Sequence, residues 1–158
     1  MRIALMLSLT AVLAVARPAA VPSVAPVTRA AAHPSISGQV TFLYYKDVDA
    51  AARFYEEVLG LEKTFDEGWV RIYAVAGRAS VGLVDETRGQ HRTAADKPVM
   101  LSIVTDEIDA WYEHMVDSGA PVLSELRESA NAPIRSFVVE DPGGYTVEFF
   151  QWLSTGSP

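Results

Sequence analysis

The sequence predicts an α+β domain built from two copies of one unit, in which a strand and a helix are followed by three more strands. An apolar strand, an aspartate, an amphipathic helix and a terminal glycine occur over residues 39–60 and again over 99–119. The aspartate and the glycine lie 13 residues apart in each copy. Alternating strands bounded by turn residues follow both copies. A repeat of this length indicates a duplicated module.

Each element of the first copy has its own signal. Strand 39–46 is apolar and ends before Asp47, a residue type that caps helices. Over 47–59, apolar residues recur at spacings of three and four, which predicts a helix with one face on a core. Gly60 suits the left-handed position that follows a helix. The three remaining strands are predicted at 61–65, 69–75 and 79–85.

The second copy repeats this order after a polar connection, residues 86–97. A strand at 99–105 and a helix at 107–118 are followed by strands at 121–126, 134–140 and 145–152. The turn Asp141-Pro-Gly-Gly separates the last two strands. The folded domain is therefore predicted at 39–153, with modules 39–86 and 98–153 and a tail at 154–158.

The first 38 residues carry signals for export. Met1 and Arg2 precede an apolar run of 14 residues, 3–16, which is shorter than the roughly 20 residues that a membrane helix needs. The run is typical of a secretory signal peptide, with an uncleaved anchor as the alternative. Residues 17–38 are rich in Ala and Pro and predict a disordered tether. We expect residues 1–16 to be a signal peptide, no stable membrane anchor, and a periplasmic or extracellular location.

Composition excludes two classes of chemistry. The chain has no cysteine, so it forms no disulfide and uses no thiolate. All 20 acidic residues follow residue 46, whereas three of the 13 basic residues precede it. The predicted domain is therefore more acidic than the net charge of −7 suggests. Because nucleic-acid binding depends on neutralising phosphates, no nucleic-acid partner is expected.

Two motifs carry a family resemblance that covers residues 39–153. Residues 46–61 read KDVDAAARFYEEVLGL, and residues 140–150 read EDPGGYTVEFF. With the repeated element order, these motifs resemble the vicinal oxygen chelate superfamily, which includes glyoxalase I, bleomycin resistance proteins and extradiol dioxygenases. The resemblance implies two βαβββ modules whose mixed sheets curl around a shared cup, with helices outside. It also implies a homodimer.

The resemblance implies a metal site, but most of its ligands are missing. In metal-binding members a histidine opens the first strand of each module, where this chain has Val40 and Val99. Glu148 is the only aligned candidate ligand. None of the three histidines, at positions 33, 91 and 114, falls on a predicted strand. We therefore predict no metal or other cofactor, and keep a divalent metal as the less favoured alternative.

Strand alternation assigns side chains to the cup. On this basis Val99, Leu101 and Ile103 face it from the second module. An arginine is expected to pair with Glu148, because an isolated buried carboxylate is costly; a purely structural ion pair is the alternative. The predicted ligand-binding residues are Phe42, Tyr44, Trp69, Arg71, Arg135, Phe137 and Glu148.

Three functions are compatible with these observations, and no catalytic residue can be named. The favoured hypothesis is a metal-free domain that binds a small organic molecule in the cup. The second is a metal-dependent lyase, isomerase or dioxygenase that uses Glu148 and further ligands. The third is a degenerate member that contacts another protein, which predicts a filled cup.

Overall fold

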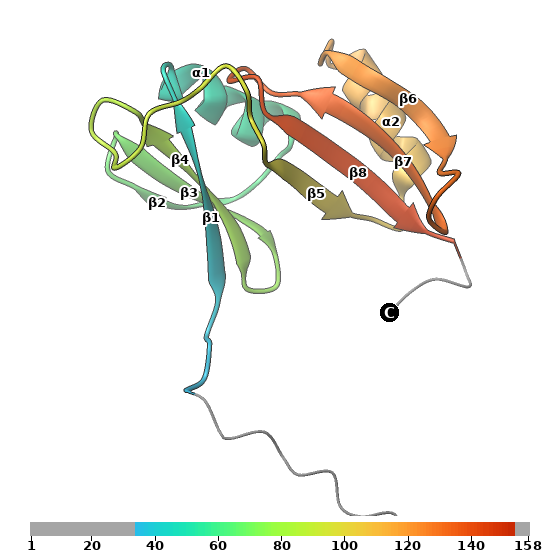
Figure 1. Cartoon of the computed structure of the whole chain (residues 1–158), viewed down its shortest axis with the longest axis horizontal. Coiled ribbons are helices and arrows are strands. Elements are labelled where there is room, and N and C mark those ends of the chain that lie inside the picture. The colour runs from blue at the N-terminus through green and yellow to red at the C-terminus, as the bar shows by residue number, and fades with distance from the viewer. Residues whose placement is uncertain (1–33, 154–158) are drawn as a thin grey trace, which may run out of the picture. The chain divides into compact units, whose positions relative to one another are not determined.

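The computed structural model describes residues 34–153, which form two βαβββ modules with a four-stranded mixed sheet in each (Figure 1). The first module comprises β1 (Gln39–Tyr45), α1 (Val48–Arg53), the π-helical turn η1 (Phe54–Val58), β2 (Lys63–Asp66), β3 (Val70–Ala76) and β4 (Ala79–Asp85). The second comprises β5 (Met100–Val104), α2 (Ile108–Asp117), β6 (Val122–Glu128), β7 (Ile134–Glu140) and β8 (Thr146–Trp152).

The two sheets have the same strand order. The order is β1-β4-β3-β2 in the first sheet and β5-β8-β7-β6 in the second. In each, the first strand pairs in parallel with the last, and the other neighbours are antiparallel. The predicted α+β class and duplicated modules are therefore confirmed. The sheets do not close on each other, so one chain does not form a complete cup.

The core lies between each sheet and its helix, and it continues from one module into the other as a single cluster. In the second module, Phe137 stacks on Phe149 with ring centroids 5.0 Å apart, and Trp111 of α2 stacks on the same phenylalanine at 4.9 Å. Burial of these large rings stabilises the helix against the sheet, since apolar area removed from water contributes about 25 cal/mol per Å².

The helices of the two modules differ by one residue. Asp47 caps α1 by accepting a hydrogen bond from the Ala50 amide. The corresponding cap of α2 is Glu107, one position after Asp106, the aspartate of the second copy. From cap to terminal glycine there are thus 13 residues in the first module and 12 in the second. The extra residue of the first module lies in η1, because a π-helical turn accommodates one residue more than an α-helical turn.

Polar contacts join the modules. The carboxylate of Asp141, in the β7–β8 turn, accepts a hydrogen bond from the Tyr45 hydroxyl at 2.6 Å. The Tyr145 hydroxyl lies 3.0 Å from the Tyr44 amide and 3.1 Å from the Tyr44 carbonyl oxygen. On the helix side, His114 Nε2 donates to the Val58 carbonyl oxygen at 2.7 Å. The Asp-Pro-Gly-Gly turn is therefore part of the contact between the two modules.

The predictions for the chain ends fall largely outside this structure. The predicted signal peptide, most of the predicted tether and the tail at 154–158 lie outside the described residues. Residues 34–38 have no regular secondary structure and are exposed. Neither helix within residues 34–153 combines the length and hydrophobicity needed to cross a bilayer.

Candidate functional site

One face of the first sheet packs on the helix and the other is open. On β1, Leu43 and Tyr45 are buried in the core, whereas Phe42 and Tyr44 point to the open face. Phe42 is 46% exposed, a large value for an aromatic ring in the middle of a strand. The placement of Phe42 and Tyr44 on the cup face agrees with strand alternation.

A cavity of about 460 Å³ lies on this open face. We call it the aromatic pocket, because four of its lining side chains are aromatic. Its size is in the range of small-molecule sites. It is lined by Phe42, Tyr44, Phe65, Trp69, Val70, Ile72 and Val84, with Glu67, Arg88, Gly89 and Gln90 at its polar side. All of these residues belong to the first module and the segment that follows it.

Two glycines let the aromatic rings lie flat against the backbone. A Cβ atom on Gly82 would be 2.4 Å from Cδ1 of Phe42, so the ring covers the bare backbone of β4. A Cβ atom on Gly89 would be 2.7 Å from Cε1 of Tyr44 and 2.5 Å from Cγ1 of Val84. Since real Cβ atoms do not approach so closely, a side chain at either position would have to displace these neighbouring side chains.

The segment after β4 folds over one end of the pocket. Asp85 Oδ1 accepts hydrogen bonds from the amide and the hydroxyl of Thr87, both at 2.7 Å, and these bonds lower the pKa of the Asp85 carboxyl. The amides of Arg88 and Gly89 donate to the Asp85 carbonyl oxygen. The Arg88 guanidinium then lies 5.4 Å from the centroid of the Trp69 ring.

Arg71 does not line this pocket, and its predicted placement is wrong. Its guanidinium lies on the helix side, 2.6 Å from Asp49 and 3.4 Å from Asp66. Tyr73 shares that side and donates to Glu56 at 2.6 Å. Strand alternation separates the polar from the apolar side chains of this strand but does not say which set faces the helix. The acidic side chains of the helix attract the polar residues of the strand, Arg71 and Tyr73. The apolar residues Val70 and Ile72 therefore line the pocket.

The second sheet shows the consequence of the one-residue difference between the helices. Leu101 and Ile103 pack against the core, so their predicted cup placement is wrong. Met100 and Val104 occupy the open face instead and are strongly exposed. The sequence alignment matched Asp47 with Asp106 because each lies 13 residues before a glycine. In the structure Asp47 corresponds to Glu107, so the predicted alignment of β5 was wrong by one residue. In a strand, such a slip exchanges the two faces.

Arg135 and Phe137 are also on the helix side, contrary to prediction. Arg135 makes a bidentate pair with Asp109 of α2, at 2.6 and 3.0 Å, which lowers the pKa of that carboxyl. Phe137 is completely buried between Phe149 and Tyr112. Neither residue is available to a ligand on the open face.

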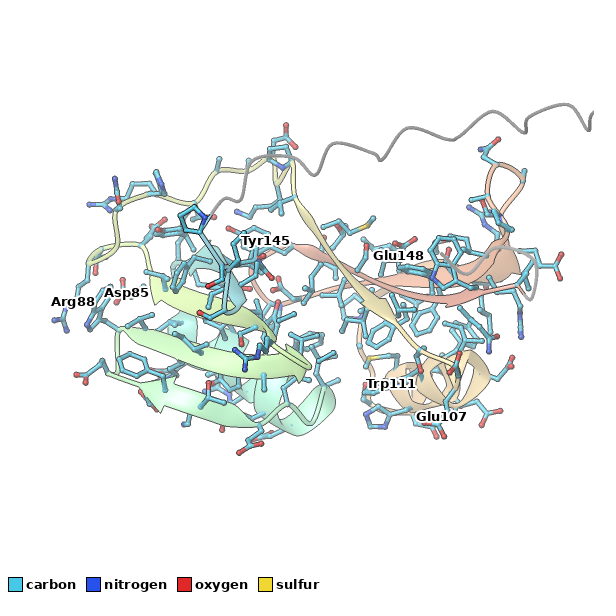
Figure 2. The ribbon with its side chains drawn as sticks, turned by 90° about the horizontal axis from the view of Figure 1, so that it is seen from below. Asp85, Arg88, Glu107, Trp111, Tyr145 and Glu148 are labelled. Carbon is cyan, nitrogen blue, oxygen red and sulfur yellow. The ribbon has the colours of Figure 1, made fainter. Side chains whose placement is uncertain are left out.

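Glu148 lies on the open face of the second sheet and does not meet the predicted arginine. Its Oε2 accepts a hydrogen bond from the Ser102 hydroxyl at 2.8 Å, across the β5–β8 pair. No ion pair to Glu148 occurs within residues 34–153. Figure 2 shows Glu148 on the second module, whereas Asp85 and Arg88 lie on the first. Glu148 is therefore not part of the aromatic pocket.

Of the predicted site residues, the structure brings three together in the aromatic pocket: Phe42, Tyr44 and Trp69. Their role in ligand binding stays a prediction. Sequence reasoning missed Arg88, because it treated residues 86–97 only as a connection. It missed Phe65, because it assigned no face to the strand at 61–65. The Arg-Gly pair at 88–89 is the one local signal, since a glycine in such a segment often marks a close backbone approach.

Comparison with known proteins gives the family. The model of the Glyoxalase/Bleomycin resistance protein/Dioxygenase superfamily matches residues 36–149. The chain belongs to this superfamily. Uncharacterized protein YwbC of Bacillus subtilis (strain 168) is 28% identical over 120 residues, which cover 70% of this chain and 94% of the relative.

Several solved structures share the fold of this chain. Lactoylglutathione lyase from Agrobacterium tumefaciens is 26% identical, with a TM-score of 0.61 and coverage of 75% of this chain and 96% of that one. A glyoxalase/bleomycin resistance protein/dioxygenase from Nocardioides is 23% identical, with a TM-score of 0.65 and coverage of 81% and 89%. TioX from Micromonospora sp. ML1 is 18% identical, with a TM-score of 0.63 and coverage of 74% and 99%. The last two show the fold alone.

The donors on the open faces do not fit the metal site that the superfamily implies. Val40 on β1 and Met100 on β5 are the outward-facing residues near the strand starts, and neither supplies an oxygen or nitrogen. Within residues 34–153, no three His, Asp or Glu side chains gather as possible metal ligands. Glu148 meets only a serine hydroxyl. A divalent ion needs three or more such donors, so one chain does not supply the site.

Proposed function

We propose that this domain binds a small organic molecule in the aromatic pocket of its first module, without the help of a metal. The observation that carries the proposal is the open cavity of about 460 Å³ with the rings of Phe42, Tyr44, Phe65 and Trp69 in its wall. Aromatic walls with few polar groups are typical of sites for flat organic ligands. The open pocket also argues against the degenerate alternative, which predicts a filled cup.

A second, larger cavity lacks the aromatic wall, and comparison with it favours the aromatic pocket as the binding site. About 600 Å³ lies beside residues 129–131, lined by serines, Arg127, Glu128 and Asn131, with Val138 and Ala130 as its apolar members. No aromatic ring lines it. A polar cavity of this kind stays filled with water unless a ligand replaces each hydrogen bond. The aromatic pocket therefore offers more binding energy per contact.

Indole, a neutral planar probe, tests the proposal. We expect its addition to shift the backbone amide signals of Phe42, Tyr44 and Trp69 in an isotope-labelled protein, with a dissociation constant of about 0.1–1 mM. The Trp69→Leu variant is expected to weaken binding about tenfold, since a stacking partner is removed. Trp111→Phe, which changes a tryptophan away from the pocket, serves as the control. Shifts confined to the second module would refute the proposal.

The likeness to lactoylglutathione lyase favours a second candidate, a metal-dependent lyase of the same superfamily. Metal analysis of protein expressed with manganese, iron, nickel and zinc distinguishes the two. Our proposal predicts less than about a tenth of an ion per chain, because a single carboxylate cannot retain a metal against dilution. One bound ion per chain that is lost in Glu148→Ala would establish the alternative.

We also propose that two copies of the chain associate through the open sheet faces. Val40, Met100 and Val104 are all at least 39% exposed on these faces. Exposed apolar side chains that gather on one face often mark a protein interface. Sedimentation is expected to give twice the chain mass of 17.2 kDa. Val104→Glu is expected to produce a monomer. Val116→Glu, at a similarly exposed position on α2, is expected to leave the dimer intact; the reverse pattern would place the interface on the helices.

A further inference from the structure

The aromatic pocket contains one positively charged group that the fold holds in place. The Arg88 backbone is fixed by the Asp85 turn, and Asp85 is itself fixed because its amide donates to the Trp69 carbonyl oxygen at 2.8 Å. The segment is anchored to β1 as well, through a bond from the Glu86 amide to the Tyr45 carbonyl oxygen. These contacts place the Arg88 guanidinium over Trp69 at the edge of the pocket.

The N–H donors of the Arg88 guanidinium bind no side-chain acceptor within residues 34–153. The guanidinium lies over the Trp69 ring, and its charge helps to lower the pKa of the Asp85 carboxyl. Nor does any side chain within the described residues form an ion pair with it. Arg71 and Arg135, by contrast, each bind a carboxylate of the neighbouring helix. Stacking leaves the N–H donors in the plane of the guanidinium free, and this planar fork matches the two oxygens of a carboxylate.

Arg88 and Glu67 are the two charged side chains in the lining of the aromatic pocket. No ion pair joins Glu67 to Arg88. No described contact holds the Glu67 side chain. A group that is fixed before binding contributes more to specificity than one that must be ordered by the ligand.

We infer that the ligand of the aromatic pocket is a planar aromatic compound that carries a carboxylate or a similar acidic group. The ring lies against Phe42, Tyr44 and Trp69, and the acid accepts two hydrogen bonds from Arg88. This inference rests on the proposed function, because it names the class of molecule that the same pocket binds. Arg88 is then the residue that selects acids over neutral or cationic aromatics.

Three probes with one ring system test the inference by calorimetric titration: indole-3-acetate, indole and tryptamine. We expect indole-3-acetate to bind about tenfold more tightly than indole, and tryptamine to bind least, since a charge-assisted hydrogen bond is strong but Arg88 is partly solvated. Arg88→Gln is expected to abolish the preference for the acid and to leave the affinity for indole within about twofold. Arg127→Gln removes the same charge from the second module and is expected to change neither.

The outcomes distinguish the ligand class from the proposed function. If indole binds to the pocket and the acid gains no affinity over it, or tryptamine binds as tightly as the acid, the ligand class is wrong while the proposed function stands. The ligand class is equally wrong if Arg88→Gln keeps the full preference. If none of the three probes binds, the proposed function fails as well. Glu67→Gln is expected to keep or increase the affinity for the acid, and a loss would contradict the role of Arg88.

Discussion

Replacing Asp141 with alanine is expected to lower the free energy of unfolding by about 3–5 kcal/mol, because it leaves several buried polar groups without partners. The side chain is 3% exposed. Its Oδ2 accepts from the hydroxyls of Tyr45 and Tyr55, at 2.6 and 3.3 Å. Its Oδ1 accepts from the amides of Gly143 and Tyr145, at 2.8 and 2.9 Å. These bonds link the β7–β8 turn of the second module to the first module.

Urea denaturation measures this effect. Tyr55→Phe, which removes the longer of the two hydroxyl contacts, is the matched smaller change and is expected to cost about 1 kcal/mol. If Asp141→Ala costs no more than Tyr55→Phe, the carboxylate does not organise the contact between the modules. A loss of cooperativity, seen as two separate transitions, would show instead that the modules can unfold independently.

The pH dependence of the same contact has an unusual sign. Burial raises the pKa of Asp141 above its ordinary value of 3.8, and this exceeds the opposing effect of its hydrogen bonds. Between the unfolded and the folded pKa the native state therefore binds more protons, so the contribution of this group declines as pH rises through that window. The stability advantage of the parent over Asp141→Asn is accordingly expected to shrink as the pH rises above the ordinary value of 3.8.

The elements of the fold were predictable because their signals are local. Strands 79–85 and 134–140 have the predicted bounds, and the second helix differs from prediction by one residue at each end. Glycines at 60 and 119 do adopt positive φ, at 63° and 74°. Alternation, capping and turn chemistry depend on neighbours in sequence, so a single chain contains the necessary information.

The faces of the strands were less predictable because they depend on distant contacts. Arg71 and Arg135 face helix carboxylates that only the tertiary structure brings near. The alignment of β5 with β1 depended on the π-helical turn η1, which adds one residue to the first helix. The equal distances from aspartate to glycine gave no sign of this extra residue. Arg88 depends on a fold of the connecting segment that no periodic pattern reports. The part of the site that the sequence predicted best is therefore the pair Phe42 and Tyr44 on β1, where alternation alone decides the face.

Two phenylalanines that were both predicted to bind ligand are expected to behave in opposite ways. Phe137→Ala is expected to cost about 3–5 kcal/mol of unfolding free energy, because its ring is fully buried and its removal leaves a cavity. The ring is parallel to that of Phe149 within 6°, and Tyr112 contacts it edge-on. Such packing cannot close over the space of a missing ring without moving α2.

Phe42→Ala is the matched change on the open face. Its ring covers Gly82 but remains 46% exposed, so the expected loss of stability is about 1 kcal/mol or less. Because the ring forms a wall of the aromatic pocket, the affinity for indole is expected to fall roughly fivefold or more. Thermal unfolding and titration of both variants provide the measurement. A folded Phe42→Ala protein with unchanged affinity would mean that the ligand does not contact β1, and a stable Phe137→Ala protein would mean that the second core is not packed as described.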